Sequence, residues 1–129
     1  MVMWKEEYSI GMAEIDEQHK VLFELVNRVQ ELLSDEFIID KYDGIIEIIN
    51  ELKAYTIYHF KAEEEYMLTI GHKKFFSQKV SHKDFLDKMD SIDLTQIDND
   101  QNKYLSEILY FVCDWLVTHI LEEDKLITA

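Results

Sequence analysis

Apolar residues recur along most of this chain at alternating steps of three and four positions, a spacing that places them on one face of a helix. Four such stretches predict helices over residues 16–33, 41–70, 74–89 and 101–123. The longest carries on one face Ile45, Ile49, Leu52, Thr56, His59, Glu63, Tyr66 and Ile70. Because the connections are short, we expect an all-α protein, an up-down-up-down four-helix bundle.

Residues at the ends of these stretches set the expected boundaries. Asp16 is a suitable N-cap for the first helix, and Gly71 stands where a glycine commonly ends a helix. Residues 90–100 are rich in Asp, Asn, Gln, Ser and Thr and predict a loop. Residues 1–15 mix apolar and polar positions and predict an N-terminal arm laid across the bundle. No repeat or shift in composition marks a second unit, so we expect a single domain over 1–129.

Composition narrows the class of protein. Three glycines and no proline favour long helices, and 129 residues can bury a core without cross-links. A net charge of -14 argues against nucleic acid as a partner. The single cysteine, Cys113, excludes a disulfide within the chain and fits a reducing compartment. We find neither a signal-peptide pattern nor an apolar run near the roughly 20 residues of a membrane helix, so we expect a cytoplasmic protein without membrane contact.

Polar side chains interrupt the apolar face of every predicted helix. They are His19, His59, Glu63, Gln78, His82 and His119. Burying any one of them without a partner costs about 1–3 kcal/mol. A lone inward histidine is more often a hydrogen-bonded core residue than a ligand. Four imidazoles and a carboxylate that converge from four helices instead favour a metal site, because a metal can bind all of these polar groups together and leave none without a partner.

The spacing of these residues supports a shared site. His59 and Glu63 lie four residues apart, one turn along the same helix face, and Gln78 and His82 have the same relation. Asp124 follows His119 by five residues, which turns its side chain by about 140°. It reaches inward if the helix end loosens, and otherwise it is a surface residue.

The ligand types indicate which metals suit the site. Imidazoles and carboxylates without thiolates suit iron, manganese or zinc. The set exceeds the needs of one ion, so two ions bridged by Glu63 and Asp124 are the economical arrangement. Ferritin-like di-iron bundles use a Glu-x-x-His motif, and this chain contains none. That class is therefore disfavoured.

Taken in order, the motifs of this chain resemble those of the haemerythrins, in particular the bacterial haemerythrin-like domains. The matching stretches are residues 15–23 (IDEQHKVLF), 59–64 (HFKAEE), 82–85 (HKDF) and 115–120 (WLVTHI), followed by Asp124, with Trp4 and Gly11-Met12 in the arm. Each piece alone is weak, but the ordered set covers nearly the whole chain and is highly specific.

The resemblance implies two non-haem iron ions joined by an oxygen bridge, which bind dioxygen. It assigns His19 and His59 to one iron, which keeps an open position, His82 and His119 to the other iron, and Glu63 and Asp124 as bridges. It also implies a dioxygen pocket walled by Leu22, Phe60, Phe85, Trp115, Leu116 and Ile120. The alternative role of these apolar residues is plain core packing, and both roles are compatible.

One position departs from the family pattern. The family has a further histidine on the second iron, four residues before the His82 position, and this chain has Gln78 there. Gln78 is either a weak oxygen ligand or a neighbour that only hydrogen-bonds. His72 lies where the family often has tyrosine, and we interpret it as a loop residue rather than a replacement ligand.

The sequence leaves three functions open. The first is reversible dioxygen binding for storage, delivery or sensing, which is not an enzymatic activity. The second is redox enzymology on peroxide or nitric oxide, which an open position at the second iron would permit. The third is a metal-binding signalling module. We favour the first, because no general base or substrate cleft is evident beyond the ligands.

Overall fold

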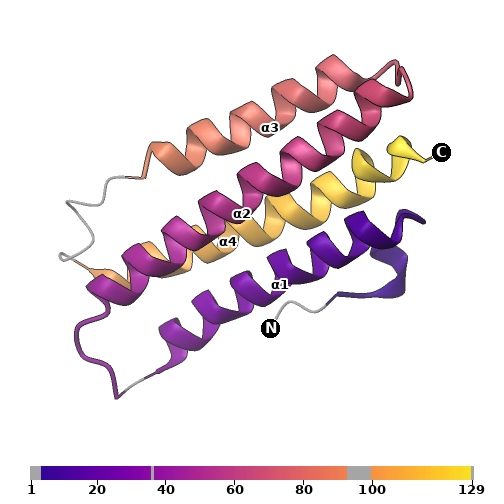
Figure 1. Ribbon diagram of the computed structural model, residues 1–129. Coiled ribbons are helices and arrows are strands. Elements are labelled where there is room, and N and C mark those ends of the chain that lie inside the picture. Colours follow the sequence, from indigo (N-terminus) through magenta and orange to yellow (C-terminus); the bar gives the residue numbers. More distant parts are fainter. Residues whose placement is uncertain (1–3, 36, 93–99, 129) are drawn as a thin grey trace.

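The computed structural model describes residues 4–35, 37–92 and 100–128, and it confirms an all-α four-helix bundle. The four long helices are α1 (Ala13–Ser34), α2 (Tyr42–Thr69), α3 (Phe75–Asp90) and α4 (Gln101–Glu122). Two short 3-10 helices are η1 (Glu6–Tyr8) and η3 (Asp124–Ile127). Consecutive long helices run in opposite directions along the bundle (Figure 1), and no strand occurs in the described part.

The helix ends lie within a few residues of the predicted bounds, with one error of interpretation. We expected Asp16 to be the N-cap of α1, but Met12 holds that position. Asp16 lies inside the first turn, where its carboxylate accepts hydrogen bonds from the Ser9 hydroxyl (2.6 Å) and the Ile10 backbone N–H (2.9 Å). It therefore ties the N-terminal arm to α1.

The end of α2 confirms the role expected of Gly71. Its φ of 63° lies in the left-handed region, which glycine adopts without a steric penalty. The next residue closes the motif, because the His72 N–H donates to the Met67 carbonyl at 2.8 Å. The chain thereby reverses into α3. The predicted loop at 90–100 lies mostly outside the described residues.

The core follows the apolar faces along the middle of the bundle. Among its most deeply buried members are Phe23, Ile45, Leu52, Met67, Met89, Leu105 and Ile120. Each large apolar side chain buried in this way contributes about 1.5–3 kcal/mol to the free energy of unfolding. The predicted apolar face is not buried as far as the C-terminal end of α2, since Ile70 is 48% exposed.

Aromatic rings fill the space between α3 and α4. The Phe85 ring centroid lies 4.4 Å from that of Trp115 and 5.4 Å from that of Phe111. The backbones of α1 and α2, of α2 and α3, and of α1 and α4 come close together along more of their length than those of α3 and α4. Large rings therefore fill the interior between α3 and α4.

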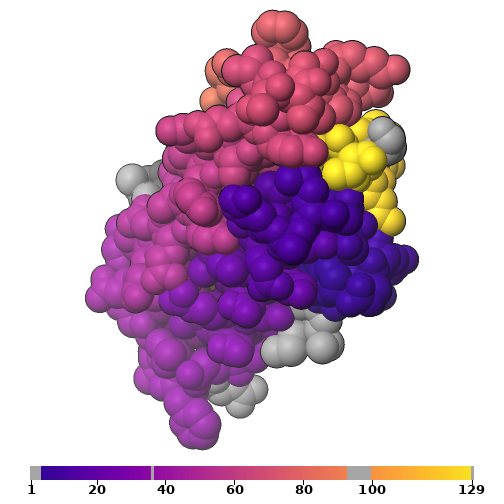
Figure 2. Space-filling model, turned by 45° about the vertical axis from the view of Figure 1, so that its right-hand side comes forward, coloured from indigo at the N-terminus to yellow at the C-terminus, as the bar shows by residue number. Residues whose placement is uncertain are grey.

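The N-terminal arm packs against α1 and the C-terminal end of the chain. Tyr8 stacks on Phe23 of α1 with ring centroids 5.4 Å apart, and both rings are buried. The Thr128 hydroxyl donates to the Ile10 carbonyl, and Figure 2 shows the arm (indigo) beside the C-terminal end (yellow). In the described chain the arm starts at residue 4. It ends at Met12 rather than at residue 15, because α1 begins three residues earlier than predicted.

One stretch, Gln101–Ile127, is long and apolar enough to cross a membrane by length and composition alone. This differs from our sequence expectation, but the core helix of a bundle meets the same test. In this fold one face of α4 is buried in the core, with Leu105, Ile108, Val112 and Leu116. One face of the stretch is therefore buried in the bundle.

Candidate metal centre

Six buried side chains converge from all four long helices and η3 near one end of the bundle. They form two groups that share two carboxylates, one of His19, His59, Glu63 and Asp124 and the other of Glu63, His82, His119 and Asp124. Within each group one ligand atom per residue lies within 4.8 Å of all the others. The arrangement is the one expected for two neighbouring metal positions with two bridging carboxylates.

The first group has its imidazoles on α1 and α2. The His19 Nε2 lies 3.0 Å from Asp124 Oδ2 and 3.7 Å from Glu63 Oε2. The His59 Nε2 lies 3.1 Å from Glu63 Oε1, across one turn of α2. All four side chains are at most 1% exposed, so water does not compete for these atoms.

The second group has its imidazoles on α3 and α4. The His82 Nε2 lies 3.3 Å from Glu63 Oε1, and the His119 Nε2 lies 3.1 Å from Asp124 Oδ1. The two Nε2 atoms lie 3.1 Å apart. Asp124 thus presents one carboxylate oxygen to each group, which is the geometry a bridging ligand needs.

Asp124 reaches the interior because α4 ends just before it. The helix stops at Glu122, and Glu123 leaves the regular path with φ -113° and ψ -56°. Asp124 then begins η3 with its side chain 1% exposed. The loosened helix end, which the sequence left as one of two alternatives, is the one observed.

Unpartnered polar atoms at the centre show that these residues fit a cation. Both ring nitrogens of His19, both carboxylate oxygens of Glu63 and Oε1 of Gln78 are buried without a hydrogen-bond partner in the described chain. Leaving such atoms unsatisfied costs about 1–3 kcal/mol each. Nitrogen and oxygen lone pairs directed at a shared point are the donor set of iron, manganese or zinc.

The charges of the first group depend on one another. Burial lowers the pKa of His19, but the carboxylates of Asp124 and Glu63 beside its ring outweigh this and raise the pKa to about 9. Burial raises the pKa of Glu63, but the charge of His59 and the close imidazoles of His19, His59 and His82 hold it well below its usual value. At neutral pH the metal-free centre therefore pairs a cationic His19 with an anionic Glu63.

This pairing predicts that metal uptake releases protons. A metal binds neutral imidazole, so His19 loses its proton on binding, and apparent affinity rises about tenfold per pH unit from 6.5 toward 9. The stability of the metal-free fold changes with pH in the opposite direction. Because the pKa of His19 is raised above 6.5 in the folded state, its protonation stabilises the fold fully below pH 6.5, and this stabilisation is lost as the pH rises through about 9. Ferrous iron added anaerobically to weakly buffered protein at pH 7.5, with a pH indicator, measures the release. Uptake without protons would contradict this assignment of charge.

Three further side chains, which the sequence did not single out, orient the imidazoles from outside. Gln18 Oε1 lies 2.7 Å from His59 Nδ1, Glu64 Oε2 lies 3.0 Å from His82 Nδ1, and Ser81 Oγ lies 3.3 Å from His119 Nδ1. Each contact occupies Nδ1 and leaves Nε2 facing the centre. Such partners fix the tautomer of a ligating histidine and raise its basicity.

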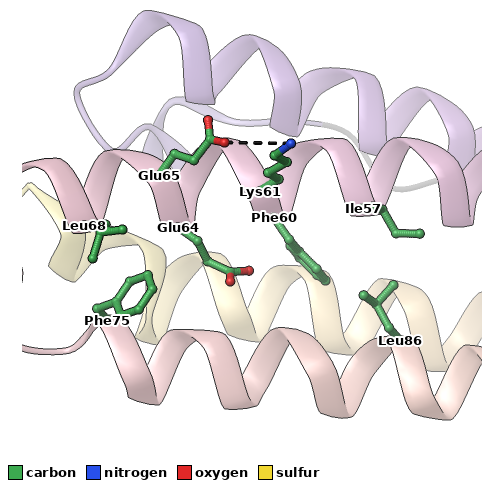
Figure 3. Close-up of a pocket in the computed structure, with 8 residues that line it drawn as sticks. All are labelled: Ile57, Phe60, Lys61, Glu64, Glu65, Leu68, Phe75 and Leu86. Carbon is green, nitrogen blue, oxygen red and sulfur yellow. Dashed lines mark ion pairs between the residues drawn. The ribbon is translucent and has the colours of Figure 1, made fainter.

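Glu64 reaches His82 across the groove between α2 and α3. Figure 3 shows Phe60 and Glu64 directed from α2 toward α3, whereas Lys61 pairs with Glu65 on the other side of the helix. The groove has its own apolar rim of Ile57, Leu68, Phe75 and Leu86. The carboxylate of Glu64 thus contacts both the groove and a histidine of the centre.

Gln78 lies beside the second group. It is 2% exposed, and its Nε2 donates a 2.6 Å hydrogen bond to Asp124 Oδ1. Its Oε1 has no hydrogen-bond partner in the described chain.

His72 lies in the turn after α2, where its ring binds the Leu126 carbonyl and the Lys74 N–H, apart from both ligand groups. The structure thus places His72 in a loop, as expected.

A small apolar cavity adjoins the two groups. Its lining is Leu22, Leu52, Thr56, Phe60, Phe85, Val112, Trp115 and Leu116, and about 10 Å³ is available to the centre of a water-sized molecule. Phe60 stacks on His82 at 3.8 Å and Trp115 on His119 at 4.2 Å, so the cavity wall contacts the imidazoles.

Five of the six residues expected in a dioxygen pocket line this cavity. The sixth, Ile120, is fully buried but is not part of the lining. Leu52, Thr56 and Val112 line it without having been predicted as pocket residues. Their inward spacing was visible in the sequence, but nothing there separated a cavity wall from ordinary core.

Comparison with known proteins places this geometry in context. Residues 11–129 match the family described as the hemerythrin HHE cation binding domain. A bacteriohemerythrin of Clostridium acetobutylicum is 47% identical over 125 residues, which cover 97% of each chain. A bacteriohemerythrin of Methylococcus capsulatus is 31% identical over 93% of this chain and 88% of its own. A crystal structure of wild-type hemerythrin is similar with a TM-score of 0.78 and 25% identity, over 100% of this chain and 99% of that one.

Proposed function

This chain belongs to the haemerythrin family, and on that premise we propose that it holds two non-haem iron ions and binds dioxygen reversibly beside them. The observation that carries the proposal is the pair of buried ligand groups sharing Glu63 and Asp124. A small apolar cavity, with about 10 Å³ open to the centre of a water-sized molecule, adjoins that pair. Metal ligands and an apolar cavity are thus combined in one core.

We assign each side chain of the centre a role. His19 and His59 hold one iron, His82 and His119 hold the other, and Glu63 and Asp124 bridge them. An oxygen bridge between the irons completes the cofactor. The distances that support this assignment are those from Glu63 Oε1 to the Nε2 atoms of His59 and His82, 3.1 and 3.3 Å, because a bridge must face both sides.

The bound irons supply two electrons to dioxygen, and the protein supplies everything else. Gln18, Glu64 and Ser81 fix the imidazole rings. The rings of Phe60, Phe85 and Trp115 and the side chains of Leu22 and Leu116 exclude water from the cavity. A dry wall slows proton access, so the oxygenated form persists long enough to release dioxygen unchanged.

A direct experiment follows. Reduced, iron-loaded protein is exposed to air and then returned to argon while its visible absorption is recorded. We expect new bands on exposure, loss of those bands under argon and their return over several cycles. Irreversible oxidation in the first cycle would refute reversible binding while leaving the iron site intact.

A second candidate function is redox chemistry on peroxide or nitric oxide. The observation that favours it is Gln78, since an amide in place of imidazole leaves the second iron with one strong ligand fewer. Turnover of either substrate well above that of free iron would establish this role. A signalling role is a third candidate, and it requires a separate partner protein. We place the protein in the cytoplasm, consistent with its lone cysteine.

A further inference from the structure

One ligand of the centre lies on a short element near the C-terminal end of the chain. Asp124 begins η3, which spans four residues, whereas the other five ligands lie on the long helices. The element is a single turn, in which the Leu126 N–H donates to the Glu123 carbonyl at 3.0 Å. A helical turn of this length is not stable by itself in water. Contacts from other elements therefore have to fix the place of the Asp124 carboxylate.

Of the five histidines, His72 is the one that belongs to neither ligand group. It lies in the turn after α2, and its ring Nε2 lies 2.9 Å from the Leu126 carbonyl oxygen. Two other hydrogen bonds hold the same region, from the Gln78 amide to the Asp124 carboxylate and from the Thr128 hydroxyl to the N-terminal arm. Among these three, the His72 contact is the one that reaches the backbone of η3 from another element.

The turn holds the His72 ring in the orientation that this contact requires. The His72 N–H donates to the Met67 carbonyl at 2.8 Å, and the Lys74 N–H donates to the ring Nδ1 at 3.1 Å. Because a backbone N–H can only donate, Nδ1 accepts, and the proton of the neutral ring lies on Nε2. That nitrogen is then the donor that the Leu126 carbonyl needs. Both contacts of the ring therefore require the same tautomer.

We propose that His72 is a positioning residue of the metal centre, which holds the Asp124 carboxylate in its bridging place by tying η3 to the turn between α2 and α3. The inference rests on the proposed two-iron centre, in which Asp124 is a ligand of both positions. His72 binds no metal, and it acts through the short stretch of backbone from Leu126 to Asp124. Asp124 Oδ2 lies 3.0 Å from His19 Nε2 and Oδ1 lies 3.1 Å from His119 Nε2, so a displacement of η3 affects both positions at once.

The test compares His72→Phe, His72→Gln and Thr69→Val. Phenylalanine keeps a ring but has no donor, whereas glutamine keeps an N–H group that can donate to the same carbonyl. Thr69 is an exposed residue near the end of α2, and its hydroxyl donates to the Glu65 carbonyl at 2.8 Å, so its substitution removes a bond that contacts no ligand. We expect His72→Phe to speed the loss of both irons to a chelator by about fivefold, within the range that one hydrogen bond contributes. His72→Gln and Thr69→Val should stay within about twofold of the wild type.

A second control separates positioning from general stability. Val29 is 2% exposed on α1, roughly three turns from His19, so Val29→Ala leaves a cavity in the core away from the centre. It should lower the melting temperature of the iron-free protein at least as much as His72→Phe does, yet leave the rate of iron loss within about twofold of the wild type.

Three results would overturn the proposal. Unchanged iron loss in His72→Phe would show that η3 holds Asp124 without this contact. Equally fast loss in Val29→Ala would mean that His72 acts through stability alone, and equally fast loss in His72→Gln would show that the donated hydrogen bond is not the cause. A wild type that does not bind two irons would instead refute the proposed two-iron centre and this inference together.

Discussion

Replacing Glu63 by alanine should abolish stable binding of both metals, with apparent affinity falling by more than about a hundredfold, beyond the range seen when only an outer partner is lost. The reason is geometric. Glu63 Oε1 faces imidazoles of both groups, and the side chain is completely buried. One substitution therefore removes a ligand from two positions at once. Iron per chain after reconstitution and desalting gives the measurement.

Its neighbours on α2 provide graded controls. Glu65→Ala changes an exposed residue that pairs with Lys61, and it should leave the iron content unchanged. Glu64→Ala is not a neutral control, because Glu64 binds His82 Nδ1 at 3.0 Å. It should weaken the second position alone by about 10–100-fold. Equal losses for Glu63→Ala and Glu65→Ala would contradict the bridging assignment.

Restoring imidazole at position 78 is the change with the next largest expected effect. If Gln78 leaves the second iron one strong ligand short, Gln78→His should slow iron loss to a chelator by more than about tenfold, on the scale that even outer partners reach. It should also lengthen the life of the oxygenated form. Chelator-driven iron release and autoxidation, both followed by absorbance, measure the two effects.

The outcome also decides between the two roles of Gln78. Its Nε2 bonds Asp124 Oδ1 at 2.6 Å, and its Oε1 has no hydrogen-bond partner in the described part of the chain, so coordination and hydrogen bonding are both compatible with its position. Unchanged rates in Gln78→His would place residue 78 outside the coordination sphere. Faster autoxidation would show that the hydrogen bond to Asp124 protects the centre and that our expectation has the wrong sign.

Much of the fold follows from local sequence patterns. The alternation of apolar residues at three and four positions places the helices within a few residues, because helix packing requires that spacing. The i, i+4 relation of His59 and Glu63 puts both on one face before any tertiary contact is known. Gly71 ends α2 for a backbone reason that sequence reveals directly.

Other features depend on tertiary structure and could not be read from the chain. Asp124 lies 140° off the helix face in a regular continuation, and it enters the core only because α4 ends at Glu122. Glu64 is next to a ligand on α2, yet its contact is with a histidine on α3. Thr56 looked like ordinary core, since a cavity is a property of packing across four helices rather than of one.

The most direct test of two metals in one shared site is the iron stoichiometry of the reconstituted protein. Iron-free protein is titrated anaerobically with ferrous iron, freed of excess, and analysed for iron and zinc against protein concentration. The account predicts saturation at about two irons per chain, the number that two ligand groups with shared carboxylates can hold. Saturation at a single iron or a single zinc, with all six ligands engaged by that one ion, would contradict it.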